Sequence, residues 1–220
     1  MEPEPIKSYL HELADAAERI LLLQGPIGTF FSDFADWLHQ QCGKTVFKLN
    51  FNAGDELCFP ATKPNTFAYT DTFQAFPDFL SAFIREHRIE AVVCFGDTRP
   101  YHIAAKSVVH VLGNVSFWAF EEGYFRPYFV TLEKSGVNAY SPLPRDARFF
   151  ADAYPHLSRQ SYQDPAPVPA GFLPVAKQAI RYYVAARLHQ RRYPHYIHHR
   201  INHIGHYVKL WTLSGLKRVN

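Results

Sequence analysis

Four short runs of consecutive apolar residues, each followed by turn and polar residues, constrain the fold of this 220-residue chain most strongly. Uninterrupted apolar runs of this length are typical of strands buried on both faces, as in parallel sheets. Segments with apolar residues at helical spacing separate them. This order predicts an α/β fold with a Rossmann-like parallel sheet and right-handed crossovers. The predicted strands are Arg19–Gln24, Thr45–Phe51, Ala91–Phe95 and Ser116–Phe120.

The remaining segments predict helices, loops and a C-terminal extension. Residues 52–72 are rich in Asn, Gly, Pro and Thr and predict a long loop, while 122–145 is expected to be irregular. We expect three parts: a Rossmann-like N-terminal part over 1–160, a Pro-rich linker over 161–174 and a basic helical segment over 175–220. The expected helices are 29–42, 72–87, 98–112, 145–154, 173–193 and a further segment reaching Leu213.

The charge is divided unevenly along the chain. The formal net charge is +3, yet residues 171–220 contain nine Lys and Arg and no acid, so residues 1–170 carry the compensating acidic excess. This division indicates an acidic body and a basic segment that faces an anion. Tyrosines interleaved with the basic residues favour a membrane-interface helix, with a packing arm folded over the body as the alternative. Nucleic acid is not expected, because the body is acidic and no recognition module is present.

Several classes of protein are disfavoured by composition. No apolar stretch approaches 18 residues, so no transmembrane helix is predicted, and the acidic, polar N-terminus is unlike a secretory signal. The three cysteines are far apart, which favours a reducing compartment over a disulfide framework or a zinc site. The histidines of the C-terminal segment lack Cys, Asp or Glu partners there, so no metal site is predicted.

Polar and special residues follow the predicted strands where ligands bind in an open parallel sheet. The turn after the first strand could receive an anion on its free amides, although it is neither a dinucleotide fingerprint nor a phosphate-binding loop. A tight turn that needs small residues is the equal alternative. The candidate substrate-binding residues of the first two turns are Gly25, Pro26, Gly28, Asn50 and Asn52.

The sequence GDTRPYH follows the third predicted strand and carries the strongest candidate chemistry. Asp97, Arg99 and His102 place a carboxylate, a guanidinium and an imidazole within one turn. These groups suit general acid–base work, or a nucleophile beside an anionic substrate held by Arg99. Capping of the next helix is the alternative role for Asp97.

The sequence EEGYFRP follows the fourth predicted strand. Adjacent side chains on a strand point to opposite faces, so we expect one of Glu121 and Glu122 to face the cleft. Two neighbouring acids suit proton transfer, and a solvated strand end is the alternative. Arg126 could hold a carboxylate or a phosphate.

Several long motifs occur in an order that resembles a known family. LLLQGPIGTFF, FKLNFNAGDE, FGDTRPYH and FEEGYFRPYFVTLEKSGVNAYSPLPRD are similar to the capsule polysaccharide biosynthesis and export proteins of Gram-negative bacteria, within their KpsS/LipB-type branch. The resemblance covers about residues 21–145, and YPHYIHHR at 193–200 adds to it.

The resemblance implies a retaining β-Kdo glycosyltransferase of GT-B-like build. It implies CMP-Kdo as donor with no further cofactor, and a phosphatidylglycerol-type lipid or a growing Kdo linker as acceptor. It also implies a cytoplasmic protein peripheral to the inner membrane, with a capsule-export ABC transporter and a companion Kdo transferase as partners. Asp97 is then expected as nucleophile or base, assisted by His102 and by Glu121 or Glu122.

The resemblance also carries one departure. A GT-B enzyme needs two Rossmann-like halves, and family members are about twice this long. The expectation is therefore one half of such an enzyme with a C-terminal basic helical extension. A non-catalytic module that docks on a membrane or exporter is the alternative function.

Overall fold

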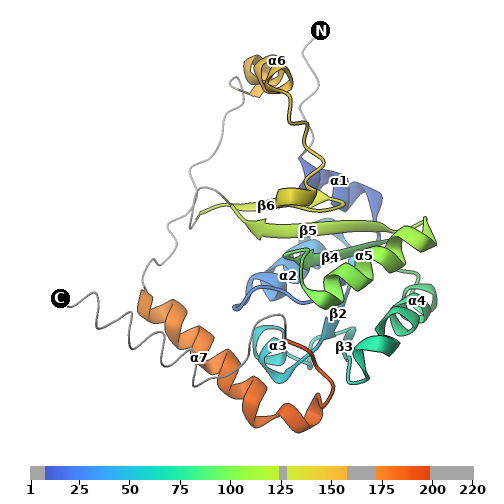
Figure 1. Ribbon diagram of the computed structural model, residues 1–220, viewed down its shortest axis with the longest axis vertical. Helices are drawn as coiled ribbons and strands as arrows, with labels where there is room; N and C mark the ends of the chain where they lie inside the picture. Colours follow the sequence, from blue (N-terminus) through green and yellow to red (C-terminus); the bar gives the residue numbers. More distant parts are fainter. Residues whose placement is uncertain (1–7, 124–127, 158–171, 199–220) are drawn as a thin grey trace, which may run out of the picture.

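A mostly parallel six-stranded sheet forms the centre of the computed structural model, which describes residues 8–123, 128–157 and 172–198 (Figure 1). The strand order is β3-β2-β1-β4-β5-β6, and only β6 runs antiparallel to its neighbour. This arrangement confirms the predicted Rossmann-like α/β fold. The strands are β1 Arg19–Leu22, β2 Thr45–Asn50, β3 Thr66–Ala68, β4 Ala91–Phe95, β5 Ser116–Glu122 and β6 Val130–Lys134.

Helices cover both faces of the sheet, because alternate residues of each buried strand point to opposite sides. Leu21 and Leu23 pack on the face covered by α4 and α5, whereas Ile20 and Leu22 pack against α1 and α2. The helices are α1 Tyr9–Ala16, α2 Phe30–Cys42, α3 Ala53–Cys58, α4 Phe76–Glu86, α5 Pro100–Leu112, α6 Ala147–Leu157 and α7 Phe172–Leu188, with 3₁₀ turns η1 Phe73–Ala75, η2 Asn138–Tyr140 and η3 Gln190–Arg192.

Two parts of the sequence-based prediction are wrong. The expected loop over 52–72 contains α3 and β3, since the Asn52 side chain caps a short helix by accepting hydrogen bonds from the amides of Gly54 and Asp55. The expected irregular stretch over 122–145 contains β6, which forms an antiparallel edge strand against β5. In both cases a short element is stabilised by tertiary partners rather than by its own propensity.

The other expected elements match the structure more closely. Gly43 ends α2 in the left-handed conformation at φ 68°. The expected helix over 145–154 is present as α6, and the basic helix ends at Leu188 rather than at Tyr193. Most of the expected linker, and the helix expected to reach Leu213, lie outside the described residues, so the proposed division into parts stays a prediction.

The long α7 lies along one edge of the molecule, and both α7 and the turn that follows it lie beside α3 (Figure 1). Tyr182 and Tyr193 are buried against the body. The C-terminal segment 172–198, called the arm below, is therefore a packing arm for at least these residues. None of the helices in the described part of the chain combines the length and the apolar character needed to cross a bilayer.

One buried cation in the sheet gives a testable pH dependence. Lys48 on β2 is 2% exposed, and burial lowers the pKa of its ammonium from 10.5 to about 8, opposed in part by Asp55. Between these two values the unfolded chain binds a proton that the folded chain has released, so the free energy of unfolding rises with pH.

We predict that this slope reaches about 1.4 kcal/mol per pH unit for wild type and is absent in Lys48→Met. Urea unfolding at pH 8, 9 and 10 measures the difference between the two proteins, which removes contributions shared by both. Parallel stability curves for wild type and Lys48→Met would contradict the assignment.

Candidate functional site

The topological switch point of the sheet lies between β1 and β4, and open α/β folds bind ligands at such a point. The loops after these two strands meet there. Arg99 Nη1 donates a hydrogen bond to the Gly25 carbonyl oxygen at 3.1 Å, so the structure joins two of the predicted site segments. Gly25 and Pro26 are half-buried.

The side chains of Asp97 and His102, which follow β4 in the chain, are buried and form hydrogen bonds with backbone groups. Asp97 is 4% exposed, and its Oδ2 accepts a hydrogen bond from the Val137 amide at 3.0 Å. His102 is fully buried, and its Nδ1 donates to the Gly96 carbonyl oxygen at 2.5 Å. The N-cap position of α5 is Arg99, so capping does not explain Asp97. Both side chains hold backbone in place, and their predicted catalytic roles stay predictions.

The Asp97 carboxylate holds the segment after β6 close to the loop that follows β4. Gly136 adopts φ 149°, and a Cβ built on it would lie 2.8 Å from Asp97 Oδ2. Only glycine therefore permits this approach without displacement. The next residues, Val137 and Asn138, then form one wall of a pocket beside the carboxyl ends of β4 and β5.

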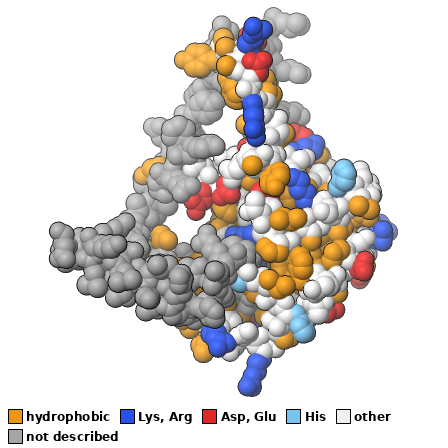
Figure 2. Space-filling model, viewed as in Figure 1, with side chains coloured by type: hydrophobic (Ala, Val, Ile, Leu, Met, Phe, Trp, Pro, Cys, Tyr) orange, Lys and Arg blue, Asp and Glu red, His pale blue; other side chains and the backbone are white. Residues whose placement is uncertain are grey.

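Both predicted glutamates line this pocket, which has a volume of about 730 Å³. Glu121 is half-buried, and its Oε2 accepts from Asn138 Nδ2 at 3.2 Å, whereas Glu122 is exposed. Figure 2 shows acidic side chains grouped at this end of the sheet. The lining residues are Glu121, Glu122, Gly123, Thr131, Glu133, Val137, Asn138, Ser141, Leu143, Pro144, Arg145 and Phe150.

The sequence reasoning missed Glu133, a third carboxylate in the pocket. Glu133 lies on β6 opposite Ala119, on the same face of the sheet as Glu121. It is only 6% exposed. Its signal is the alternation of polar and apolar residues over 130–134, which is visible only once this stretch is recognised as a strand.

A second polar cluster lies at the carboxyl end of β2, where the arm meets α3. The Asp55 carboxylate is 4% exposed and accepts hydrogen bonds from Tyr182 OH at 2.8 Å, Gln24 Nε2 at 3.0 Å and the Phe51 amide at 2.9 Å. Asn52 Nδ2 donates to the Tyr182 oxygen at 2.9 Å. We call these residues the Asp55 network.

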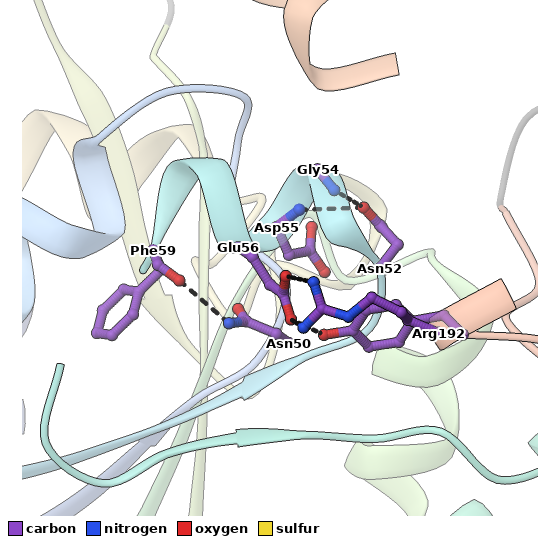
Figure 3. A network of polar contacts seen from close by, with 8 residues as sticks. Asn50, Asn52, Gly54, Asp55, Glu56, Phe59 and Arg192 are labelled. Carbon is purple, nitrogen blue, oxygen red and sulfur yellow. Dashed lines mark hydrogen bonds and ion pairs between the residues drawn. The ribbon is translucent and has the colours of Figure 1, made fainter. Parts of the chain in front are cut away.

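The rim of the Asp55 network holds the turn after α7. Arg192 forms a two-pronged ion pair with Glu56 at 2.7 and 2.8 Å, and Tyr193 OH donates to Glu56 Oε1 at 2.6 Å (Figure 3). Burial raises the pKa of Tyr193, and the hydrogen bond to Glu56 raises it further. The hydroxyls of the arm therefore stay protonated donors at neutral pH.

The predicted substrate-binding residues of the first two turns make internal contacts. The Gly28 amide donates to Cys58 Sγ at 3.2 Å, and Asn50 Nδ2 donates to the Phe59 carbonyl oxygen at 3.1 Å. Within the described residues, the buried Asn50 Oδ1 has no hydrogen-bond partner. Their contacts with a substrate stay predictions, and Arg126 lies outside the described residues.

These features define an α/β protein whose Rossmann-like sheet carries an acidic pocket at its carboxyl edge. Comparison with known sequences then shows the family. The chain belongs to the capsule polysaccharide biosynthesis protein family, whose sequence model matches residues 90–220.

Curated relatives agree with this membership. The chain is 56% identical over its whole length to the capsule polysaccharide modification protein LipB of Neisseria meningitidis serogroup B, covering 52% of that protein. It is 38% identical over 84% of its length to the capsule polysaccharide export protein KpsS of Escherichia coli, covering 46% of that protein. The chain thus spans about half the length of these relatives, and it has a role in capsule biosynthesis.

Among solved structures, the chain is similar to a dTDP-glucose 4,6-dehydratase from Bacillus anthracis at 19% identity and a TM-score of 0.34. The match covers 45% of this chain and 36% of that one.

Close packing at Gly54 gives a test of the docked arm. In a helix, Gly54→Ala should stabilise by about 1 kcal/mol through helix propensity alone. Here a Cβ on Gly54 would lie 2.7 Å from the Tyr182 ring, so overpacking reverses the sign. We predict a net loss of about 1–2 kcal/mol in unfolding free energy, with faster amide hydrogen exchange in α7.

Gly113→Ala serves as the matched control, because its Cβ would meet no described residue within 4 Å other than its chain neighbours, although its φ of 73° adds backbone strain. That strain should lower global stability without accelerating exchange in α7 selectively. Unchanged or slower exchange in α7 of Gly54→Ala would contradict the docked arrangement.

Proposed function

We propose that this chain is one half of a retaining glycosyltransferase of capsule biosynthesis that transfers Kdo from CMP-Kdo. The acceptor would be a phosphatidylglycerol-type lipid or a growing Kdo linker, at the cytoplasmic face of the inner membrane. A capsule-export ABC transporter and a companion Kdo transferase would be its partners. The names of the relatives, which concern capsule polysaccharide modification and export, support the process.

The observation that carries this proposal is the carboxylate pocket at the carboxyl end of β5. A retaining transfer needs a carboxylate nucleophile or base at the sugar, or departure from the front face. Glu121 is half-buried, lines the pocket and is held by Asn138, so it is positioned to meet a substrate. The exposed Glu122 stands next to it.

Asp97 and His102 take positioning roles in this proposal. Asp97 is engaged by the Val137 amide, and His102 is fully buried behind Gly96, so both act through the loops that they hold. Arg99, together with Arg126, would hold the anionic part of a substrate. Gly25, Pro26 and Gly28, with Asn50 and Asn52, would contact the rest of the substrate.

A transfer assay with CMP-Kdo and a lipid acceptor tests the proposal, using the full gene product that contains this sequence. We predict that Glu121→Gln lowers kcat by about 100-fold or more, since it removes a reacting carboxylate and keeps the side chain's shape. Glu86→Gln, at the exposed end of α4, is the matched control and should transfer at the wild-type rate.

Asp97→Asn separates positioning from chemistry. The amide keeps an oxygen that can accept from Val137, so we expect a smaller loss of kcat than for Glu121→Gln, with a change in KM. If Glu121→Gln transfers Kdo at the wild-type rate, Glu121 is not the reacting carboxylate.

A second function, a non-catalytic module that docks on a membrane or exporter, is favoured by the outer face of α7. That face exposes Ile180, Val184 and Leu188 beside Lys177 and Arg187, and the arm contains no acid. Absence of transfer by the wild-type protein, together with co-sedimentation with anionic vesicles at low salt, would support this function over the enzyme.

A further inference from the structure

The buried carboxylate of Glu133 is an unusual feature of the acidic pocket. Glu133 is 6% exposed and lines the pocket, and its Oε2 has no hydrogen-bond partner among the described residues. Leaving a buried carboxylate oxygen without a donor costs free energy. The Glu133 side chain lines the pocket, so a ligand that donates a hydrogen bond to its carboxylate would offset part of that cost.

The charge of the pocket selects the kind of ligand. Among the described residues that line the pocket, Glu121, Glu122 and Glu133 carry carboxylates and Arg145 carries a guanidinium. Arg145 is exposed and partly engaged, since its Nη2 donates to the Ala139 carbonyl oxygen at 3.4 Å. An anionic group in this pocket would meet a net negative field, and like charges in contact disfavour binding.

A metal ion is not what the pocket fits. Within the described ranges, no group of three His, Cys, Asp or Glu side chains is arranged to hold a metal ion. The other polar groups of the pocket are uncharged: the hydroxyls of Thr131 and Ser141 and the amide of Asn138. Together with the aromatic ring of Phe150, they can contact hydroxyls and the apolar face of a sugar-like molecule.

We propose that this pocket is a subsite for a neutral, hydroxyl-rich group, and that Glu133 sets its specificity. A ligand hydroxyl donates to the Glu133 carboxylate, which excludes ligands that carry a carboxylate or phosphate at the same position. The proposal rests on the proposed function and deepens it. The pocket holds the uncharged hydroxyl-bearing part of the acceptor, and the anionic sugar of the donor binds outside it.

A matched pair of ligands tests this on the chain itself, without any transfer reaction. Methyl α-D-glucoside and methyl α-D-glucuronide differ only in a CH₂OH group against a carboxylate. Amide chemical-shift titration of wild type is expected to show shifts at Thr131, Asn138 and Ser141 with the glucoside. The glucuronide is expected to bind about tenfold or more weakly.

Glu133→Gln is the decisive variant, because it removes the charge and keeps the side chain's length. We expect it to lower the affinity for the glucoside by about tenfold, because a charge-assisted hydrogen bond is lost. The ratio of the glucoside affinity to the glucuronide affinity should also fall. A purely structural role would lower both affinities and leave that ratio unchanged. Glu86→Gln is expected to bind both ligands as wild type does.

Phe150→Ala provides a second variant if Glu133→Gln unfolds, since Phe150 is 50% exposed. Phe150→Ala should lower the affinities for both glycosides by the same factor, so that the ratio of the two affinities is unchanged. Equal or tighter binding of the glucuronide by wild type, or no binding of the glucoside, would overturn the proposal. Absence of Kdo transfer, with the neutral ligand still preferred, would instead refute the proposed function and leave the subsite standing.

Discussion

The Asp55 carboxylate is the interaction on which the arrangement of the carboxyl edge depends. It is nearly inaccessible to water and accepts hydrogen bonds from three different segments: the end of β1 through Gln24, the end of β2 through the Phe51 amide, and α7 through Tyr182. A buried charge is tolerated only when it is satisfied in this way. The arm therefore supplies, through Tyr182, one of the hydrogen bonds that stabilise the buried Asp55 carboxylate.

Asp97 plays the equivalent part on the other side of the switch point. Asp97 accepts a hydrogen bond from the Val137 amide and so holds the segment after β6 at the carboxyl edge of the sheet. There Asn138 contacts Glu121, and the segment forms one wall of the acidic pocket. Two buried aspartates, each at the end of a different strand region, thus bring distant segments together. The candidate site is a product of these tertiary contacts and not of a single local motif.

The sequence was informative where the pattern is local. Continuous apolar runs identified four of the six strands, β1, β2, β4 and β5. The residues at the carboxyl ends of β4 and β5, among them Asp97 and Glu121, were recognisable because carboxyl-edge positions are defined by strand order.

The rest depended on contacts between residues far apart in the chain. Nothing near Asp55 indicates that Tyr182 is its partner, since 127 residues separate them. Glu133 was missed because β6 is an edge strand whose pairing with β5 stabilises it. The burial of His102 likewise follows from tertiary packing, and its imidazole holds the loop after β4 through the hydrogen bond to the Gly96 carbonyl oxygen.

The most direct test of this account is a double-mutant cycle that joins Asp55→Asn with Tyr182→Phe, with unfolding free energies measured in urea. If the hydroxyl and the carboxylate depend on each other as described, their coupling energy is about 1–3 kcal/mol. Additivity of the two changes to within about 0.5 kcal/mol would contradict the account, because the arm would then be held by other contacts.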